Sequence, residues 1–425
     1  MLLIGTAGFL AGYLVIGSVE LQLQWLLAVC LPAGVACLVR RRGDGMARDA
    51  MMRLAAAFLA WNLAVGLARN ADAFADFYTF EFLAGAVLLP VYLGSLWLVC
   101  RGGGHRALLV TLAWAGGIAA VAGLYYWRFH QVVEIPGSRL RNPLVHQGQH
   151  PVGTGMCFAF ALAVTGTLYA TVRPGLRRAG MLLTVAVMML AVMLTLSRGA
   201  LLALACVPAA LLAAAFWNRQ AATFLRLSWP PLAVAAAMAV GFQCFSGWLA
   251  PEPPPPPDLP PGVTVVHLEK LGHNPLREFI ERSDTGRSIF YRKGLGYMDT
   301  RDKHLTGAGL WGPDLKLERD IGIEHFHSIY VATYIHSGII GSALLMALLA
   351  LGVRRAWVLL QHGQPQWLAL LAFGLGGLIF DGQSLCSLVT HPRFENLILW
   401  FPLVVIAAQW RSLQAGRQLS SSGSR

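Results

Sequence analysis

Three short polar segments interrupt an otherwise apolar chain, and each contains residue types that can act on a charged or hydroxyl-bearing substrate. The first is LSRGA at residues 196–200, the second begins at Gly286-Arg287, and the third is HFHS at residues 325–328. The planar guanidinium of an arginine suits phosphate oxygens. A histidine can act as a base near neutral pH, because its ordinary pKa is about 6.5. These residue types indicate binding of a phosphorylated group and activation of a hydroxyl.

Each segment also has a purely structural interpretation. Arg198 could snorkel from a helix end to the membrane interface, and Arg287 could be a solvated side chain in a loop of mixed charge. His327 could cap a helix or pack against the loop. His325 and His327 together would suit a metal, but no third ligand stands nearby at zinc-site spacing. The sequence therefore predicts neither a metal site nor a cofactor.

The composition indicates that a membrane-embedded bundle holds these segments. Of the 425 residues, 56% are hydrophobic and 13% are charged, whereas about 25% are charged in an ordinary soluble domain. A bilayer core about 30 Å thick is crossed by roughly 20 apolar residues in a helix. Twelve such blocks predict an all-α polytopic membrane protein with about 12 transmembrane helices. We expect the spans at about residues 2–18, 20–39, 51–68, 80–100, 106–127, 151–172, 179–196, 199–217, 228–249, 328–352, 366–386 and 394–411.

The formal net charge of +12 follows from the predicted topology. Lysines and arginines gather in the short gaps between apolar blocks, and twelve crossings place all of these gaps on the same side as both termini. An excess of positive charge marks the cytoplasmic side of a membrane protein. The charge therefore requires no nucleic-acid partner. The clusters lie at residues 40–48, 101–106, 173–178, 219–226, 354–355 and 411–425.

The chain divides into three parts on this topology. Residues 1–249 contain the first nine transmembrane helices, residues 250–327 form one large outer loop, and residues 328–425 contain the last three helices and a short cytoplasmic tail. Eight prolines at residues 251–261 predict a stiff polyproline II spacer. Asn274, followed by a proline, predicts the start of a short amphipathic helix in the loop.

The order of the polar motifs is similar to that of a known family. SRG at residues 197–199 is followed by GRSIF at 286–290, GAG at 307–309, HSIY at 327–330 and GIIG at 338–341. This series resembles the O-antigen ligase/polymerase superfamily of membrane glycosyltransferases over about residues 190–345. RLRNP at residues 139–143 resembles the arginine-containing earlier outer loop of that family. The chain departs from the family at Ser328, where asparagine is usual, and at His336, where an acidic residue is frequent.

The resemblance implies a GT-C-like fold and transfer of a glycan from undecaprenyl pyrophosphate at the periplasmic face of a Gram-negative inner membrane. Arg198 and Arg287 are then the expected ligands of the donor pyrophosphate, with Arg139 or Arg141 as helpers. A fixed arginine charge can stabilise a departing pyrophosphate without a metal. The expected partners are this lipid-linked donor, a lipid A–core acceptor and membrane lipids.

His327 is the expected general base for the acceptor hydroxyl, because it occupies the histidine position of the family motif. His325 and His336 are the alternatives. Nine residues separate His327 from His336, and about 900° of helical rotation would turn their side chains to opposite faces.

Three activities within the superfamily fit these motifs. A ligase attaches finished glycan to lipid A–core, a polymerase joins repeat units on the lipid carrier, and a protein O-oligosaccharyltransferase uses a serine or threonine. Twelve spans with the large loop before the tenth favour the ligase. A transporter without chemistry is a further alternative, and it would carry charged residues in the middle of the membrane. The chain has its polar residues at one face, with Asp381 in the predicted eleventh span as the exception.

Overall fold

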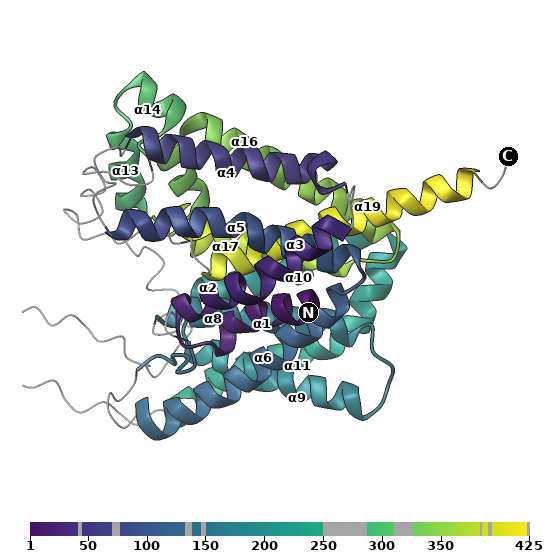
Figure 1. Ribbon diagram of the computed structural model, residues 1–425. Coiled ribbons are helices and arrows are strands. Elements are labelled where there is room, and N and C mark those ends of the chain that lie inside the picture. The colour runs from purple at the N-terminus through teal and green to yellow at the C-terminus, as the bar shows by residue number, and fades with distance from the viewer. Residues whose placement is uncertain are drawn as a thin grey trace, which may run out of the picture.

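The computed structural model describes residues 1–40, 45–69, 77–131, 138–145, 150–249, 287–309, 326–382, 385–389 and 393–422. These residues form a bundle of helices and contain no strand (Figure 1). The proline-rich segment at 251–261, the helix expected after Asn274, and His325 lie outside the described residues.

The helical segments follow one another along the chain with short connections between most of them. They are α1 (Leu2–Val15), α2 (Val19–Trp25), η1 (Leu26–Cys30), α3 (Leu31–Arg40), η2 (Met46–Arg48), α4 (Ala50–Arg69), α5 (Phe77–Arg101), α6 (His105–Tyr126), η4 (Trp127–Gln131), α8 (Pro151–Tyr169), α9 (Leu176–Leu194), α10 (Arg198–Ala215), α11 (Arg219–Leu249), α13 (Arg287–Tyr297), α14 (Arg301–Thr306), α16 (Ile329–Gln361), α17 (Gln366–Phe380), α18 (Leu385–Val389), η7 (Asn396–Trp400) and α19 (Phe401–Ser422).

Each of the predicted spans coincides with a helical segment. Within the described residues, nine segments are long and apolar enough to cross a membrane, with α2, η1 and α3 together forming one of them. Three further apolar segments are shorter, namely α1, residues 88–101 of α5, and α17. The all-helical, multi-pass membrane class is confirmed, whereas the exact number of twelve crossings stays a prediction.

The centre of the bundle consists of α8, α17 and the continuous segment formed by η7 and α19, whose side chains are mostly buried. Small residues allow the helices to approach closely, as is usual in lipid. A Cβ atom at Gly116 of α6 would overlap Ala161 of α8, and one at Gly376 of α17 would overlap Cys206 of α10. The peripheral α2, α3 and α11 bury only a small share of their residues, as expected for helices that face lipid.

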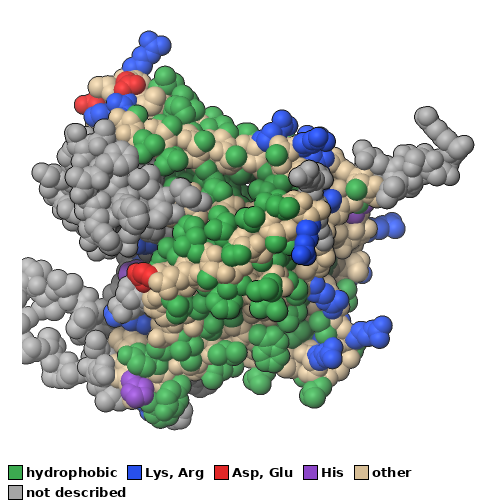
Figure 2. All heavy atoms as spheres, viewed as in Figure 1, with side chains coloured by type: hydrophobic (Ala, Val, Ile, Leu, Met, Phe, Trp, Pro, Cys, Tyr) green, Lys and Arg blue, Asp and Glu red, His purple; other side chains and the backbone are tan. Residues whose placement is uncertain are grey.

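The short helices α13 and α14 lie together at one end of the bundle, against α4 and α16 (Figure 1). Both belong to the predicted outer loop. Arg69 at the end of α4 pairs with Asp302 of α14 and donates to Thr306 Oγ1 at 2.8 Å. Lysine and arginine side chains gather at the opposite end of the visible face (Figure 2). This distribution agrees with the predicted orientation, which itself stays a prediction.

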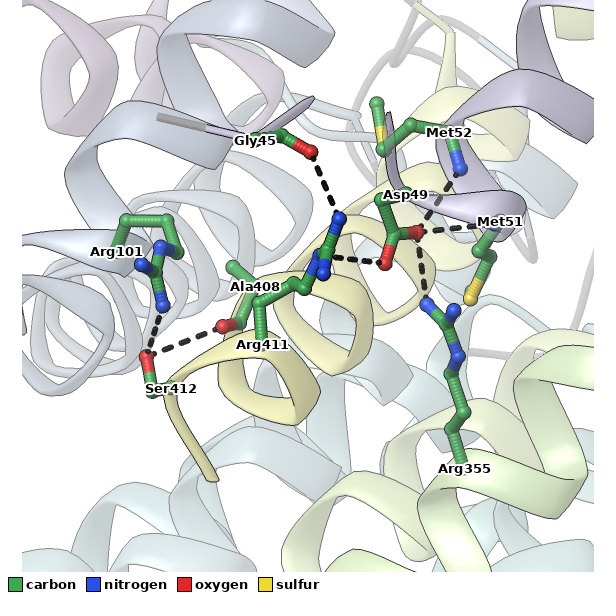
Figure 3. A network of polar contacts seen from close by, with 9 residues as sticks. All are labelled: Gly45, Asp49, Met51, Met52, Arg101, Arg355, Ala408, Arg411 and Ser412. Atoms are coloured by element: carbon green, nitrogen blue, oxygen red, sulfur yellow. Dashed lines mark hydrogen bonds and ion pairs between the residues drawn. The ribbon is translucent and has the colours of Figure 1, made fainter. Parts of the chain in front are cut away.

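A buried ion cluster joins three helices at this opposite end (Figure 3). Asp49 is almost fully buried and accepts the backbone N–H groups of Met51 and Met52 at 2.9 and 3.2 Å, so it caps α4. Arg355 of α16 donates to Asp49 Oδ1 at 2.8 Å, and Arg411 of α19 lies 3.6 Å from Asp49 Oδ2. The carboxylate therefore holds the start of α4 against α16 and α19.

Replacing Asp49 by asparagine should destabilise the bundle, because Arg355 would keep its charge in a buried site without its carboxylate. Loss of one partner of a buried ion pair costs about 3–5 kcal/mol, while asparagine still caps the helix. Thermal unfolding in detergent would measure the change. Asp299→Asn is the matched control, since that exposed acid lies 3.0 Å from Lys303 Nζ and should leave the midpoint unchanged. Equal midpoints for both variants would contradict the structural role of the cluster.

Candidate functional site

The turn between α9 and α10 places Arg198 at the start of α10. Leu196 has a φ of +50°, a left-handed conformation that reverses the chain between the two helices. Ser197 is the N-cap, and its Oγ accepts the backbone N–H of Ala200 at 3.3 Å. Arg198 is the first residue of the helix and is half-buried. The predicted pyrophosphate ligand thus lies at a helix N-terminus, which carries partial positive charge of its own.

Asp381 lies against this N-terminus. The residue follows the end of α17 rather than continuing the helix, and its side chain is only 4% exposed. Ser197 Oγ donates to Asp381 Oδ2 at 3.3 Å. A Cβ atom at residue 199 would overlap the Asp381 carboxylate, so the close approach requires Gly199. The SRG motif therefore combines a helix cap, an arginine and the space for a carboxylate.

The N-terminus of α16 reaches the same turn of the chain. A Cβ atom at Gly382 would lie 2.7 Å from the backbone nitrogen of Ile329, the first residue of α16. Ser328 is the N-cap position of this helix, and His327 precedes it with a φ of +56°. His327 is half-buried. The Asp381-Gly382 turn thus connects the helix N-termini that carry Arg198 and His327.

The segment at residues 138–145 lies beside the turn between α9 and α10. Arg139 Nε donates to the carbonyl oxygen of Thr195 at 2.6 Å, and the backbone of Leu140 donates to that of Leu194 at 2.9 Å. Gln131 holds the segment from the other side, since its Oε1 accepts the backbone N–H of Arg141 at 3.3 Å. Arg139 is half-buried, whereas the Arg141 side chain is exposed. The structure brings Arg139 to the Arg198 turn and places Arg141 on the same segment, facing outward.

Arg287 is the first residue of α13, and this helix packs against the residue that precedes His327. A Cβ atom at Gly294 of α13 would lie 2.5 Å from Ile335 Cδ1 and 2.6 Å from Phe326 Cε1. Gly294 follows Arg287 by seven residues, which corresponds to about 10 Å along a helix. The helix that begins with Arg287 therefore covers the start of α16.

Helix α16 is broken two residues after His336, and this break gives His336 a structural role. Gly338 has a φ of +66°, which interrupts the helix. The extended segment after α14 fills the break, since the backbone N–H groups of Ala308 and Gly309 donate to the carbonyl oxygens of Ile335 and His336 at 2.8 and 3.0 Å.

The His336 side chain takes part in this junction. Its Nδ1 lies 2.8 Å from the carbonyl oxygen of Gly309, and its ring centroid lies 6.0 Å from that of Phe326. Helical rotation does not separate His336 from His327, because His327 lies outside the helix that begins at Ile329. What separates the two histidines is their environment. His336 is buried and bonded to the loop, and His327 is half-buried at the start of α16.

Two other titratable groups near α14 have clear partners. His304 Nδ1 lies 2.6 Å from the Tyr334 hydroxyl. The hydrogen bond from Lys303 holds the pKa of the Asp299 carboxyl below its usual value. Among the described residues, no group of three histidine, cysteine or acidic side chains is arranged to hold a metal. A metal-independent reaction stays a prediction.

In the sequence, Asp381 stands out only as an acid inside a predicted span, with no role of its own. A carboxylate at membrane depth is costly unless it is paired or faces a polar site. The position of Asp381 inside an apolar span is therefore the sequence feature that indicates a role in a polar site. Ser197, which donates to Asp381, lies 184 residues earlier in the chain, and only the packing of α10 on α17 brings the two residues together.

Comparison with known families agrees with the motifs. A family model described as O-antigen ligase matches residues 183–346, which include both helix N-termini of the site. The match places this part of the chain in the O-antigen ligase superfamily and confirms the resemblance drawn from the motifs. It supports a glycosyltransferase activity of the ligase or polymerase type in a multi-pass membrane protein. No curated protein sequence matches the chain.

Replacing Gly199 by alanine should disturb the junction, because the added methyl group would overlap the Asp381 carboxylate. Overpacking of this kind costs about 1–3 kcal/mol, which thermal unfolding in detergent would detect. Gly180→Ala is the matched control, since a Cβ atom at that helical glycine meets nothing within 4 Å and should stabilise the protein by about 0.5–1 kcal/mol.

A double variant tests whether the carboxylate causes the loss. Gly199→Ala combined with Asp381→Ala should cost less than the sum of the two single changes, because residues in contact are not additive. Strict additivity would show that the methyl group at residue 199 does not act on Asp381.

Proposed function

We propose that the chain is an O-antigen ligase, which transfers glycan from undecaprenyl pyrophosphate to lipid A–core at the periplasmic face of the inner membrane. The observation that carries this proposal is the meeting of two helix N-termini at the Asp381-Gly382 turn, one bearing Arg198 and the other preceded by His327. Both residues lie within the region that matches the family model. The junction supplies positive charge for a pyrophosphate and a histidine for a hydroxyl.

The donor pyrophosphate binds at the N-terminus of α10 in this proposal. Arg198 supplies a fixed charge, the N-terminus of α10 adds its partial positive charge, and Arg139 lies on the neighbouring segment. Arg287 contributes from the start of α13, and Arg141 serves as a further helper. These charges stabilise the pyrophosphate as it departs, so the reaction needs no metal.

His327 acts as the general base in the transfer step. Its imidazole accepts the proton of the acceptor hydroxyl while that oxygen forms a bond to the anomeric carbon of the donor. The bond between the anomeric carbon and the pyrophosphate oxygen breaks, and the pyrophosphate leaves with the electron pair, still attached to its lipid. The half-buried position of His327 at the start of α16 allows contact with a hydroxyl arriving from the membrane surface.

The topology of the site also follows from this proposal. Residues 250–327 form the large periplasmic loop between the helices of residues 1–249 and those of residues 328–425, with both termini in the cytoplasm.

The polymerase and the protein O-oligosaccharyltransferase use the same chemistry with other acceptors, and a transporter would use none.

Purified His327→Ala should bind the lipid-linked donor yet transfer glycan more slowly by about 10²–10⁴-fold, the usual effect of removing a general base. Arg198→Ala and Arg287→Ala should instead lose donor binding, and lysine should restore it only partly because it lacks the planar fork. Donor binding and transfer are measured separately, with excess chelator in a parallel reaction. His336→Asn is the control, since asparagine can still donate to Gly309, and it should keep most activity.

The outcomes of this experiment separate the assigned roles. A near wild-type rate in His327→Ala would remove this residue from catalysis. Normal donor binding in Arg198→Ala would do the same for the pyrophosphate site. Strict dependence on a divalent ion would overturn the metal-independent mechanism.

Deletion of the gene followed by analysis of lipopolysaccharide distinguishes the acceptors. Loss of a ligase should leave lipid A–core without glycan, while long glycan accumulates on the lipid carrier. Core that carries a single repeat unit would identify a polymerase instead. Unchanged lipopolysaccharide together with loss of glycan from proteins would identify a protein O-oligosaccharyltransferase.

A further inference from the structure

An apolar groove with a cavity volume of about 250 Å³ runs between α4 and α5. One wall is a stripe of α4 that includes Met52, Ala56, Leu59 and Leu63, spaced as on one helical face. The other wall comes from α5 and includes Pro90. Because α4 packs mainly on α16 and little on α5, these walls are not closed against each other. The groove lies along a membrane-spanning segment, so lipid rather than water faces it.

The length of the groove matches one leaflet of a bilayer. Met52 and Leu63 are eleven residues apart on α4, which corresponds to about 16 Å along the helix. The hydrocarbon core of a bilayer is about 30 Å thick, so one acyl chain extends over about half of that distance. An occupant from a single leaflet fills the groove from one end to the middle of the membrane.

The end of the groove near Met52 is positively charged. Arg48 and Arg53 are exposed there, on either side of the start of α4. Among the described residues, the acid at this end is Asp49. It is buried and paired with Arg355 and Arg411 (Figure 3). Its charge is therefore not presented to a ligand, and the exposed groups are the two guanidiniums. A basic cluster beside an apolar groove between transmembrane helices favours an anionic lipid.

We propose that this groove binds one acyl chain of an anionic phospholipid whose phosphate pairs with Arg48 and Arg53. The bound lipid would fill the space between α4 and α5 that the alanines leave open. This site is separate from the proposed glycan-transfer site. Helix α4 links the groove to the broken part of α16. Its Trp61 Nε1 donates to the carbonyl oxygen of Ser337 at 3.0 Å, beside the break.

Photoactivatable phosphatidylglycerol, carrying its reactive group on the acyl chain, tests the proposal on the full-length protein in nanodiscs. Labelling should concentrate on peptides containing residues 52–63 and should be competed by unlabelled phosphatidylglycerol more strongly than by phosphatidylcholine. Ala56→Trp should abolish most of the labelling by filling the groove. Ala57→Trp is the matched control, because Ala57 is also exposed on α4 but does not line the groove.

Surface variants keep the test valid if the tryptophan disturbs folding. Arg48→Gln and Arg53→Gln should each lower the preference for phosphatidylglycerol over phosphatidylcholine about fivefold, whereas the exposed Arg177→Gln on α9 should not. Equal competition by both lipids in the wild type, or labelling that Ala56→Trp and Ala57→Trp leave alike, would overturn the proposal. Co-purification of an isoprenoid phosphate that blocks the labelling would assign the groove to a different lipid.

Discussion

A buried carboxylate at the end of α17 organises the part of the molecule that we assign to catalysis. Asp381 accepts a hydrogen bond from Ser197, and its position is possible because residue 199 has no side chain. The next residue, Gly382, has space only for a glycine, because a Cβ atom there would overlap the backbone nitrogen of Ile329 at the start of α16. Helix N-termini carry partial positive charge, so two of them can share one turn when a negative charge lies nearby. The segments with Arg139, Arg198 and His327 all lie around this junction.

The second organising feature is the break in α16 and the loop that fills it. A broken transmembrane helix exposes backbone carbonyl groups that must find donors, because hydrocarbon offers none. Ala308 and Gly309 supply them, and Gly338 provides the left-handed conformation at the break. The same contacts carry α14 to its place at one end of the bundle. An irregular piece of helix thereby holds part of the predicted outer loop against the helices.

Helix α4 connects the two ends of the molecule. At one end Asp49 joins it to α16 and α19, and near the other end Trp61 and Arg69 contact the broken region of α16 and the helix α14. Another face of the helix, on which alanines lie between Met52, Leu59 and Leu63, borders the apolar groove. The helix therefore has a structural role on one side and an open, lipid-facing surface on the other.

The sequence by itself determined the helical membrane class, the positions of the apolar helices and the family motifs around Arg198 and His327, because apolar length and short motifs are local properties of the chain. Two features of the site depended on tertiary structure. Asp381 reaches Ser197 and so belongs to the site only because α17 packs on α10. His336 is separated from His327 by its contacts with Phe326 and Gly309 rather than by helical rotation. Both depend on packing between segments that are distant in sequence or on a non-helical backbone at His327. Periodicity within a single span contains no information about either.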